Sequence, residues 1–533
     1  MSKAKWLFMF LLALSMAVPT FAVELSLGGF PSYMRTRSRY IANSTFISAL
    51  NNEQARFLGF NNADDNIFFM DTTLRLTPQL VLSDSVTIRA QVNVFDNNIW
   101  GGTTTGFLGG TGQSTVVNSS ISFSDRFRGA ILTGPKAVDD PGFFDVRMLH
   151  ADIVLPHNLG FVRVGRQPFD WGLGILANGG WDPYSDLGFV LDRFLYLKSF
   201  AAGSSSVTFV LVSDIFTQGN SVVAGNGNGY DIAAAALIFN SPNVGGGNLT
   251  IGGYVFPYIH QNNIFTSENP PPATGQPTSG IDLDHLTLWS GLIDYKTDLW
   301  RLVGEIQGAW GELTVPRLVG SDRHIDVDAS NFIWAARAEV YPGWPMKIIA
   351  AEFGWSKGAS GNAFEEGNSL DGGAIFFNPA YNVDNLLFKN IIPNIYQVES
   401  SVYNAYYARL WGTIKLIDEL SFTPQVLVAF NDQTENPSAI ADGGSNFADL
   451  SIDTYLATEV EGTLTWHIYP GVNLDFIGGV VIPGSSLDDL LTAQALNTLE
   501  DNGFEGDRSD VNYDSTPWTV QGRLMIFIDQ FFK

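Results

Sequence analysis

The sequence predicts an all-β fold, in which a single antiparallel transmembrane β-barrel of about 18 strands has short turns at one end and long loops at the other. Three observations predict this fold. Apolar and polar residues alternate along many short segments, and short turns alternate with long polar connections. Although 45% of the residues are hydrophobic, no stretch after residue 22 offers the roughly 20 apolar residues of a membrane-spanning helix. Because every backbone polar group in lipid must be hydrogen-bonded, a closed ring of strands is the structure that remains.

The N-terminus predicts a signal peptide over residues 1–22. Lys3 and Lys5 precede a short apolar run, and Thr20 and Ala22 occupy the positions that favour cleavage after Ala22. The apolar run is too short for a spanning anchor. We therefore expect an exported chain whose residues 23–533 form one barrel in the cell outer membrane.

Composition excludes several classes of function. The chain has 54 acidic and 29 basic residues, and its net charge of −25 disfavours nucleic acid, whose binding needs clustered cations. It contains no cysteine, which excludes disulfides and thiolate metal sites. The six histidines show no HExxH or paired metal-ligand spacing, and no GxSxG motif occurs. We expect no enzyme activity, no cofactor and no metal.

The alternation is clearest in a hairpin formed by residues 67–82 and 86–94. In each segment one face is apolar, while the other carries polar residues that include Arg75 and Arg89. Residues 83–85 form the short turn between them. The same pattern recurs over 454–466 and 520–528, as expected for the repeating unit of a barrel.

Turns and loops set the strand count. We expect about eight short turns, near residues 83–85, 156–159, 202–205, 241–247, 297–299, 342–345, 417–419 and 470–471, alternating with about nine loops. The loops lie near 43–65, 97–144, 168–188, 217–229, 261–283, 312–330, 358–401, 432–452 and 484–516. These join about 18 strands with both termini at the short-turn end, and about 16 is the alternative because 189–201 and 206–216 are apolar on both faces. Aromatic residues beside the turns at 341–344 and 469–471 predict a girdle at the membrane surface.

A basic wall is predicted inside the barrel. Arg35, Arg37 and Arg39 recur at every second residue and so share one face. Facing lipid at mid-depth would cost about 2–4 kcal/mol for each, so they are expected to face the lumen. The same parity predicts a pore-lining basic set of Arg35, Arg37, Arg39, Arg75, Arg89, Arg163 and Arg523.

The opposite wall is predicted to be mainly acidic. Its pore-lining residues are expected to be Glu305, Glu339, Glu352, Glu459 and Glu461. A basic wall facing an acidic one would produce a transverse field across a water-filled lumen. The alternative is that these charges pair and fill the interior as a structural network.

Two further features leave alternatives open. Tyr254, Phe256 and Tyr258 share one face of a strand, either as inward stacking surfaces for sugar rings or as a structural lining or rim girdle. The loop 97–144 is either an inward constriction or a surface loop. The acidic loops either bridge to lipopolysaccharide through divalent cations or are simply solvated.

The chain also resembles a known class. Residues 524–532 alternate apolar side chains up to Phe532, which resembles the C-terminal assembly signal of outer-membrane proteins. With the leader and the hairpins, the whole mature chain resembles Gram-negative outer-membrane porins. More narrowly, the early arginines and the run 162–167 followed by Phe169-Asp170-Trp171-Gly172 resemble the alginate-export porin family. That family would imply an electropositive conduit for an anionic polysaccharide.

The sequence thus predicts an outer-membrane porin for passive diffusion of small polar solutes, with arginines that attract anionic groups. One alternative is a substrate-specific or polysaccharide-export channel. Another is a non-conducting structural or adhesive barrel that acts through its extracellular loops. The expected partners are outer-membrane lipid, lipopolysaccharide, small polar solutes and the barrel-assembly machinery, with a homotrimer left open.

Overall fold

The computed structural model describes residues 24–99, 145–217, 229–261, 282–316, 324–358, 369–371, 377–396, 402–434, 452–501, 503 and 511–531, apart from 28–29, 59, 61, 64, 186–187, 232 and 379. The predicted signal peptide and the loop segment 100–144 lie outside these residues.

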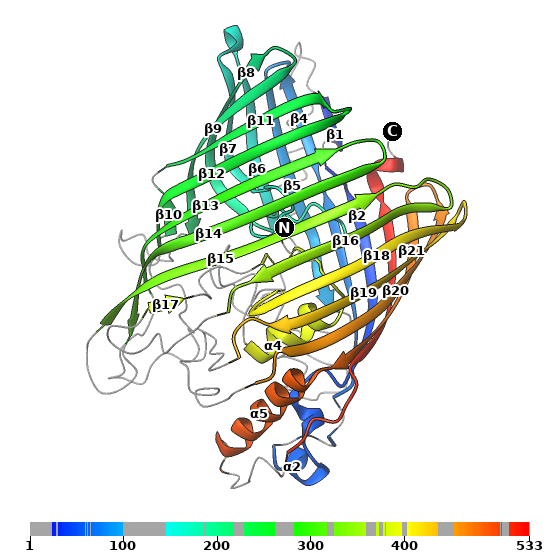
Figure 1. Cartoon of the computed structure of the whole chain (residues 1–533). Helices are drawn as coiled ribbons and strands as arrows, with labels where there is room; N and C mark the ends of the chain where they lie inside the picture. The colour runs from blue at the N-terminus through cyan, green and yellow to red at the C-terminus, as the bar shows by residue number, and fades with distance from the viewer. Residues whose placement is uncertain are drawn as a thin grey trace, which may run out of the picture.

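The described chain is almost entirely β-sheet. Its strands are β1 (Glu24–Leu27), β2 (Tyr33–Ala42), β3 (Ile67–Leu76), β4 (Pro78–Ser83), β5 (Val86–Ile99), β6 (Asp145–Leu155), β7 (Gly160–Pro168), β8 (Val190–Ala202), β9 (Ser205–Thr217), β10 (Gly229–Asp231), β11 (Ala234–Val244), β12 (Gly247–Gln261), β13 (Asp282–Lys296), β14 (Trp300–Pro316), β15 (His324–Val340), β16 (Met346–Ser356), β17 (Ser369–Asp371), β18 (Ala405–Ile417), β19 (Leu420–Asn431), β20 (Tyr455–Tyr469), β21 (Val472–Pro483) and β22 (Trp518–Phe527). Sequential strands pair antiparallel around a ring, which β22 closes by pairing with β2 (Figure 1).

This ring has 18 crossings in the described residues when β1 is counted with β2, β3 with β4 and β10 with β11. The short β17 is not counted among these crossings, and it pairs in parallel with Asp328–Ser330 of β15. The predicted strand number and the alternation of short turns with long loops are therefore confirmed. Tyr33 pairs with Phe527 at the short-turn end, where both terminal strands were expected to end.

The outer surface is that of a transmembrane barrel. Outward aromatic rings form a continuous row across five strands near the loop end, in which Trp310, Trp289, Phe332, Trp355 and Tyr406 contact in turn. At the turn end of β14, Trp300 packs against Tyr295. In a strand tilted by about 40°, the ten residue steps from Trp300 to Trp310 cover about 25 Å along the barrel axis, which is the height of an apolar membrane belt.

Helices lie at the turns, inside the barrel and at the loop end: η1 (Phe46–Ala49), α2 (Asn52–Phe57), η2 (Pro156–Asn158), η3 (Leu387–Ile391), α4 (Ile392–Tyr396), α5 (Ser485–Asp501) and η6 (Ile528–Phe531). Among the described residues, no helix has the length and apolar character needed to cross a membrane. The helix α5 packs against η1 beyond the loop end, where Leu487 and Leu490 are buried (Figure 1).

The loop-end cap, which consists of η1, α2 and α5, contains a buried carboxyl group. Asp65 accepts hydrogen bonds from the Thr45 amide (2.5 Å) and the Ser48 hydroxyl (2.6 Å). Burial raises the pKa of Asp65 to about 6, although these hydrogen bonds oppose the shift. Asp65 also lies near Tyr513, and the pKa of Tyr513 is raised by burial and by the charge of Asp65.

We expect the cap to loosen as pH rises. The pKa of Asp65 is higher in the folded cap than in an unfolded chain, so the folded cap holds a proton that the unfolded chain has already lost. The stabilisation is complete below about pH 4, near the pKa of an aspartate in the unfolded chain, and disappears as pH passes about 6, the pKa of Asp65 in the folded cap. Each pKa unit is worth about 1.4 kcal/mol. Hydrogen exchange of residues 46–57 should show less protection at pH 7.5 than at pH 4.5 after correction for intrinsic rates. In Asp65→Asn this pH dependence should flatten, and an unchanged slope would contradict the assignment.

Candidate functional site

The lumen is the candidate site, and a long inward segment crosses it. This strap, residues 169–185 with 188–189, links β7 to β8. The Arg35 guanidinium on β2 donates to the carbonyls of Pro183 (2.9 Å) and Ser185 (3.1 Å). The Glu305 carboxylate on β14 accepts from the amides of Leu173 (2.6 Å) and Gly174 (3.0 Å). Because β2 and β14 lie on opposite sides of the ring, the strap spans the barrel interior.

Glycine lets the strap approach the wall closely. Gly172 adopts φ +57°, and a Cβ there would lie 2.5 Å from Glu305 Oε2. Gly180 also has a positive φ of 64°, and its carbonyl accepts from Arg75 (3.1 Å). A side chain at Gly172 would push the strap away from the carboxylate that anchors it.

The predicted aromatic lining is covered by this strap. Tyr254 and Phe256 face inward and are 6% and 2% exposed, because Phe169 and Trp171 pack against them. Tyr258 does not continue their row, because a shift in register between β12 and β13 gives the next buried position to Ile259. The expectation of an accessible row of three stacking rings is therefore wrong, and the structural lining is the better description.

A second inward segment, the plug, consists of residues 377–378, 380–396 and 402–404. Arg409 on β18 donates to the carbonyls of Asn382 (3.0 Å) and Val383 (2.9 Å). On β20, Glu459 accepts from the Leu387 amide (2.8 Å). Strap and plug are joined directly, since Asn378 N donates to the Ile175 carbonyl (2.5 Å).

The plug also carries its own buried acid. Asp384 accepts hydrogen bonds from the amides of Phe388 (2.8 Å) and Lys389 (3.1 Å), which begin the turn of η3. Burial raises the pKa of Asp384 to about 7, while these two amides oppose the rise and Glu461 adds to it. Glu461 in turn accepts from the side-chain amide of Asn385 (2.7 Å).

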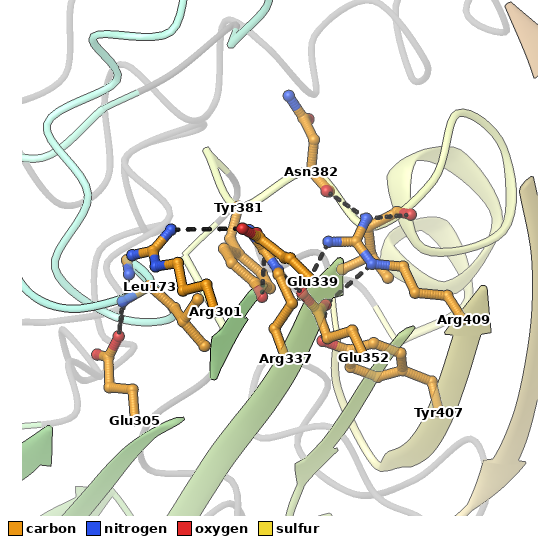
Figure 2. Close-up of polar contacts among 12 residues, drawn as sticks. Leu173, Arg301, Glu305, Arg337, Glu339, Glu352, Tyr381, Asn382, Tyr407 and Arg409 are labelled. Carbon is orange, nitrogen blue, oxygen red and sulfur yellow. Dashed lines mark hydrogen bonds and ion pairs between the residues drawn. The ribbon is translucent and has the colours of Figure 1, made fainter. Parts of the chain in front are cut away.

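Glu352 lies at the centre of a charge network beneath the plug (Figure 2). Its carboxylate accepts from Arg337 Nε (2.6 Å), Arg409 (3.0 Å) and the Tyr407 hydroxyl (2.7 Å), and it has no exposed surface. Arg337 also donates to the Tyr381 hydroxyl of the plug (3.2 Å). Glu352 on β16 is thus shared by one arginine from each flanking strand, Arg337 on β15 and Arg409 on β18.

The predicted acidic wall is therefore not a surface that faces water. All five acids point inward as parity predicts, but Glu305, Glu352 and Glu459 are at most 2% exposed. They accept hydrogen bonds from the strap, the plug and wall arginines. Glu339 likewise lies beside Arg301 (3.9 Å) and Arg337 (3.6 Å). A transverse field set up by an open acidic wall is wrong for these residues, because the strap, the plug and wall arginines cover their carboxylates.

The basic wall divides into covered and open parts. All seven predicted arginines lie on inward-facing positions of their strands. Arg35, Arg37 and Arg75 are at most 3% exposed, so they are not open to the lumen as pore-lining groups. In contrast, four arginine side chains keep contact with solvent: Arg39 (13%), Arg523 (15%), Arg163 (24%) and Arg89 (26%).

Aspartates hold these arginines in place. Asp71 bonds both Arg37 and Arg39, at 2.8 Å each. Asp152 likewise bonds Arg89 (3.0 Å) and Arg163 (2.6 Å). Because each of these acids serves two arginines, both groups keep an excess of positive charge.

Several inward arginines are not among those singled out in the sequence analysis, and Arg147 and Arg193 are two of them. Arg147 donates to the strap carbonyl of Gly179 (2.7 Å), and Arg193 bonds Asp214 (2.5 Å). Arg147 lies at a bulge between β5 and β6 that breaks the alternation. The signal for Arg193 was present, because a lone arginine in a strand with two apolar faces needs a partner such as Asp214 on the next strand.

Comparisons with known proteins give a likeness of fold. No protein-family model matches the chain, and no curated protein matches its sequence. Among solved structures, the outer-membrane protein OprD of Pseudomonas aeruginosa is 8% identical, with 94% of this chain and 95% of that chain covered and a TM-score of 0.41. OccAB2 of Acinetobacter baumannii is 10% identical, with 94% and 98% covered and a TM-score of 0.41. Similarity this low leaves the function to be argued from the chain itself.

Proposed function

We propose that this barrel is an outer-membrane porin that lets small polar solutes diffuse passively, with a preference for anions. The observation that carries the proposal is the set of solvent-accessible arginines along one side of the lumen. Arg39 lies nearer the loop end, Arg523 lies near the middle of β22, and Arg89 and Arg163 lie nearer the turn end. Together they place positive charge at successive depths inside a low-dielectric wall, which focuses the field on passing ions.

The strap and the plug support a limit on solute size. The strap crosses the lumen from β2 to β14, and the plug lies against β16 to β20, where Tyr407 packs against Phe377 and Phe388. An 18-stranded ring is wide enough to leave an aqueous channel, and these segments narrow it. The narrowing favours small solutes over the anionic polysaccharide that the narrower resemblance to alginate-export porins implied.

A non-conducting barrel is the second candidate, and the buried network around Glu352 favours it. Planar-bilayer recording of the purified protein separates the two proposals. Stepwise openings that prefer anions are expected for the porin. Electrical silence of correctly folded protein would overturn the porin proposal and leave a structural or adhesive barrel.

Neutralising the accessible arginines should reverse the ion preference. In a variant with Arg39, Arg89, Arg163 and Arg523 all changed to Gln, the aspartates that paired with them remain in the lumen. The lumen then carries excess negative charge, so the anion-to-cation permeability ratio should fall from above one to below one. Reversal potentials in a salt gradient measure this ratio.

A matched control removes a charge from the outer surface. Lys198 lies on the outer face of β8, where it bonds the carbonyl of Asn158 in a turn. Lys198→Gln should leave the reversal potential unchanged. An unaltered potential in the arginine variant would show that these side chains do not set selectivity.

The outer surface and the last strand support two further proposed partners. The apolar belt would contact outer-membrane lipid, with lipopolysaccharide around the aromatic row at the loop end. On β22, outward-facing Leu524 and Ile526 alternate with inward Arg523 and Met525. We propose that β22, which carries this alternation, is the segment that the barrel-assembly machinery binds.

A further inference from the structure

An ion pair lies on the outer face of the barrel, where hydrocarbon is expected. Arg166 on β7 and Asp192 on β8 are directly paired in register and form two parallel hydrogen bonds of 2.9 Å. Their side chains are 37% and 47% exposed. Neighbouring residues Gly165 and Arg193 face the lumen, so Arg166 and Asp192 face outward.

Apolar side chains surround this pair. The outward cross-strand neighbours are Leu149 beside Arg166 and Ile215 beside Asp192, both 51% exposed. Two residues nearer the turn end, Val164 and Phe194 are 44% and 50% exposed. The pair is therefore set within the apolar belt.

The strand geometry puts the pair near the middle of that belt. Tyr196 lies at the turn end of this face, where its hydroxyl bonds the carbonyl of Leu159 beside a turn. Asp192 is four residues further along the tilted β8, about 10 Å nearer the loop end. For a belt about 25 Å tall, this depth is close to the midplane.

Lipid is a poor neighbour for these groups. A charged side chain on the lipid face is most costly at mid-depth and becomes tolerable near the headgroups. The other outward acid–base contact among the described strand residues, His285 with Glu312 (3.8 Å), lies close to the loop end and fits that rule. The position of Arg166 and Asp192 indicates that protein covers this part of the barrel.

We propose that this face, formed by β6 to β9 around Arg166 and Asp192, is the interface with a second copy of the chain. Charge complementarity identifies the occupant. Both copies cross the membrane in the same direction, so a two-fold axis parallel to the barrel axis keeps equal depths opposite each other. An axis between the two side chains then sets Arg166 opposite the partner's Asp192 and Asp192 opposite the partner's Arg166.

No other part of the described outer face carries charges that complement Arg166 and Asp192 better. Apart from Arg166 and Asp192, the described outward charges lie toward the two ends of the barrel, as do Lys198 at a turn and Glu312 near the loops. A ring of three copies would set the pair against a different face of the neighbour. The pair therefore favours a self-complementary dimer over the homotrimer that the sequence left open.

Cross-linking tests the interface in native outer membranes. The natural chain has no cysteine, so single-cysteine variants give one defined label each. Phe194→Cys lies beside the proposed axis, and Phe353→Cys is a matched control, since both phenylalanines are outward and half exposed (50% and 56%). The control lies on β16, on the far side of the ring. A short bifunctional maleimide should yield dimer from Phe194→Cys and only monomer from Phe353→Cys.

A charge exchange then tests the mechanism. In the Phe194→Cys background, Arg166→Asp sets like charges together and should abolish the cross-linked dimer. The double exchange Arg166→Asp with Asp192→Arg restores every pairing and should restore the dimer, which also separates loss of contact from loss of folding. Equal cross-linking at positions 194 and 353, or a dimer that persists in folded Arg166→Asp, would overturn the proposal. The inference rests on the barrel fold alone, so its outcome is independent of conductance.

Discussion

Glu352→Ala should lower the free energy of unfolding by about 3–5 kcal/mol, the cost of removing one partner from a buried ion pair. Glu352 is fully buried and accepts from Arg337, Arg409 and Tyr407. Its loss leaves the guanidinium groups of Arg337 and Arg409 close together without the carboxylate that bridges them. The remaining partners of Arg337 are weaker, because Glu339 lies 3.6 Å away and Tyr381 offers a neutral hydroxyl.

Urea unfolding in lipid vesicles, followed by tryptophan fluorescence, measures this change. Glu352→Gln keeps an acceptor oxygen without the charge, so its loss should lie between those of the wild type and Glu352→Ala. Glu312→Ala is the control, because Glu312 is 39% exposed and close to the loop end, where a change of less than about 0.5 kcal/mol is expected. Equal stability of Glu352→Ala and Glu312→Ala would contradict a structural role for the network.

The sequence predicted most of the barrel because the membrane imposes a strict rule on each strand. A guanidinium in hydrocarbon is costly, so alternation alone placed Arg35, Arg37 and Arg39 on the inner face. Closure of the ring by β22 against β2 also followed, since an even strand number leaves both terminal strands at the turn end. The rule has a limit at bulges, where an extra residue reverses parity, as at Arg147 and Tyr258.

The contents of the lumen could not be predicted in the same way. Parity shows that Arg35 and Glu305 point inward, and it does not show what meets them there. Their partners are backbone carbonyls and amides of the strap, which have no signature in the side-chain sequence. An inward charge can face water or a loop, and the choice depends on contacts between segments more than 100 residues apart in the chain, which local patterns do not encode.

Shortening the strap should widen the pore more than any point substitution. Replacing residues 171–185 by a few glycine and serine residues removes the segment that joins β2 to β14 across the lumen. It also uncovers Arg35 and Arg75, whose hydrogen bonds to strap carbonyls are lost. We expect single-channel conductance to rise severalfold, and anion preference to increase, because these cations then face water.

Glu305→Ala tests the same strap without shortening it. This change removes the acceptor of the Leu173 and Gly174 amides, so one end of the strap is released while Arg35 still holds the other. The open-channel current should become noisier, with excursions toward the larger conductance of the shortened variant. Glu312→Ala removes an acid from the same strand on the outer side and should behave as the wild type. If both strap variants fold and conduct like the wild type, the narrowest part of the pore lies elsewhere and the strap is not its constriction.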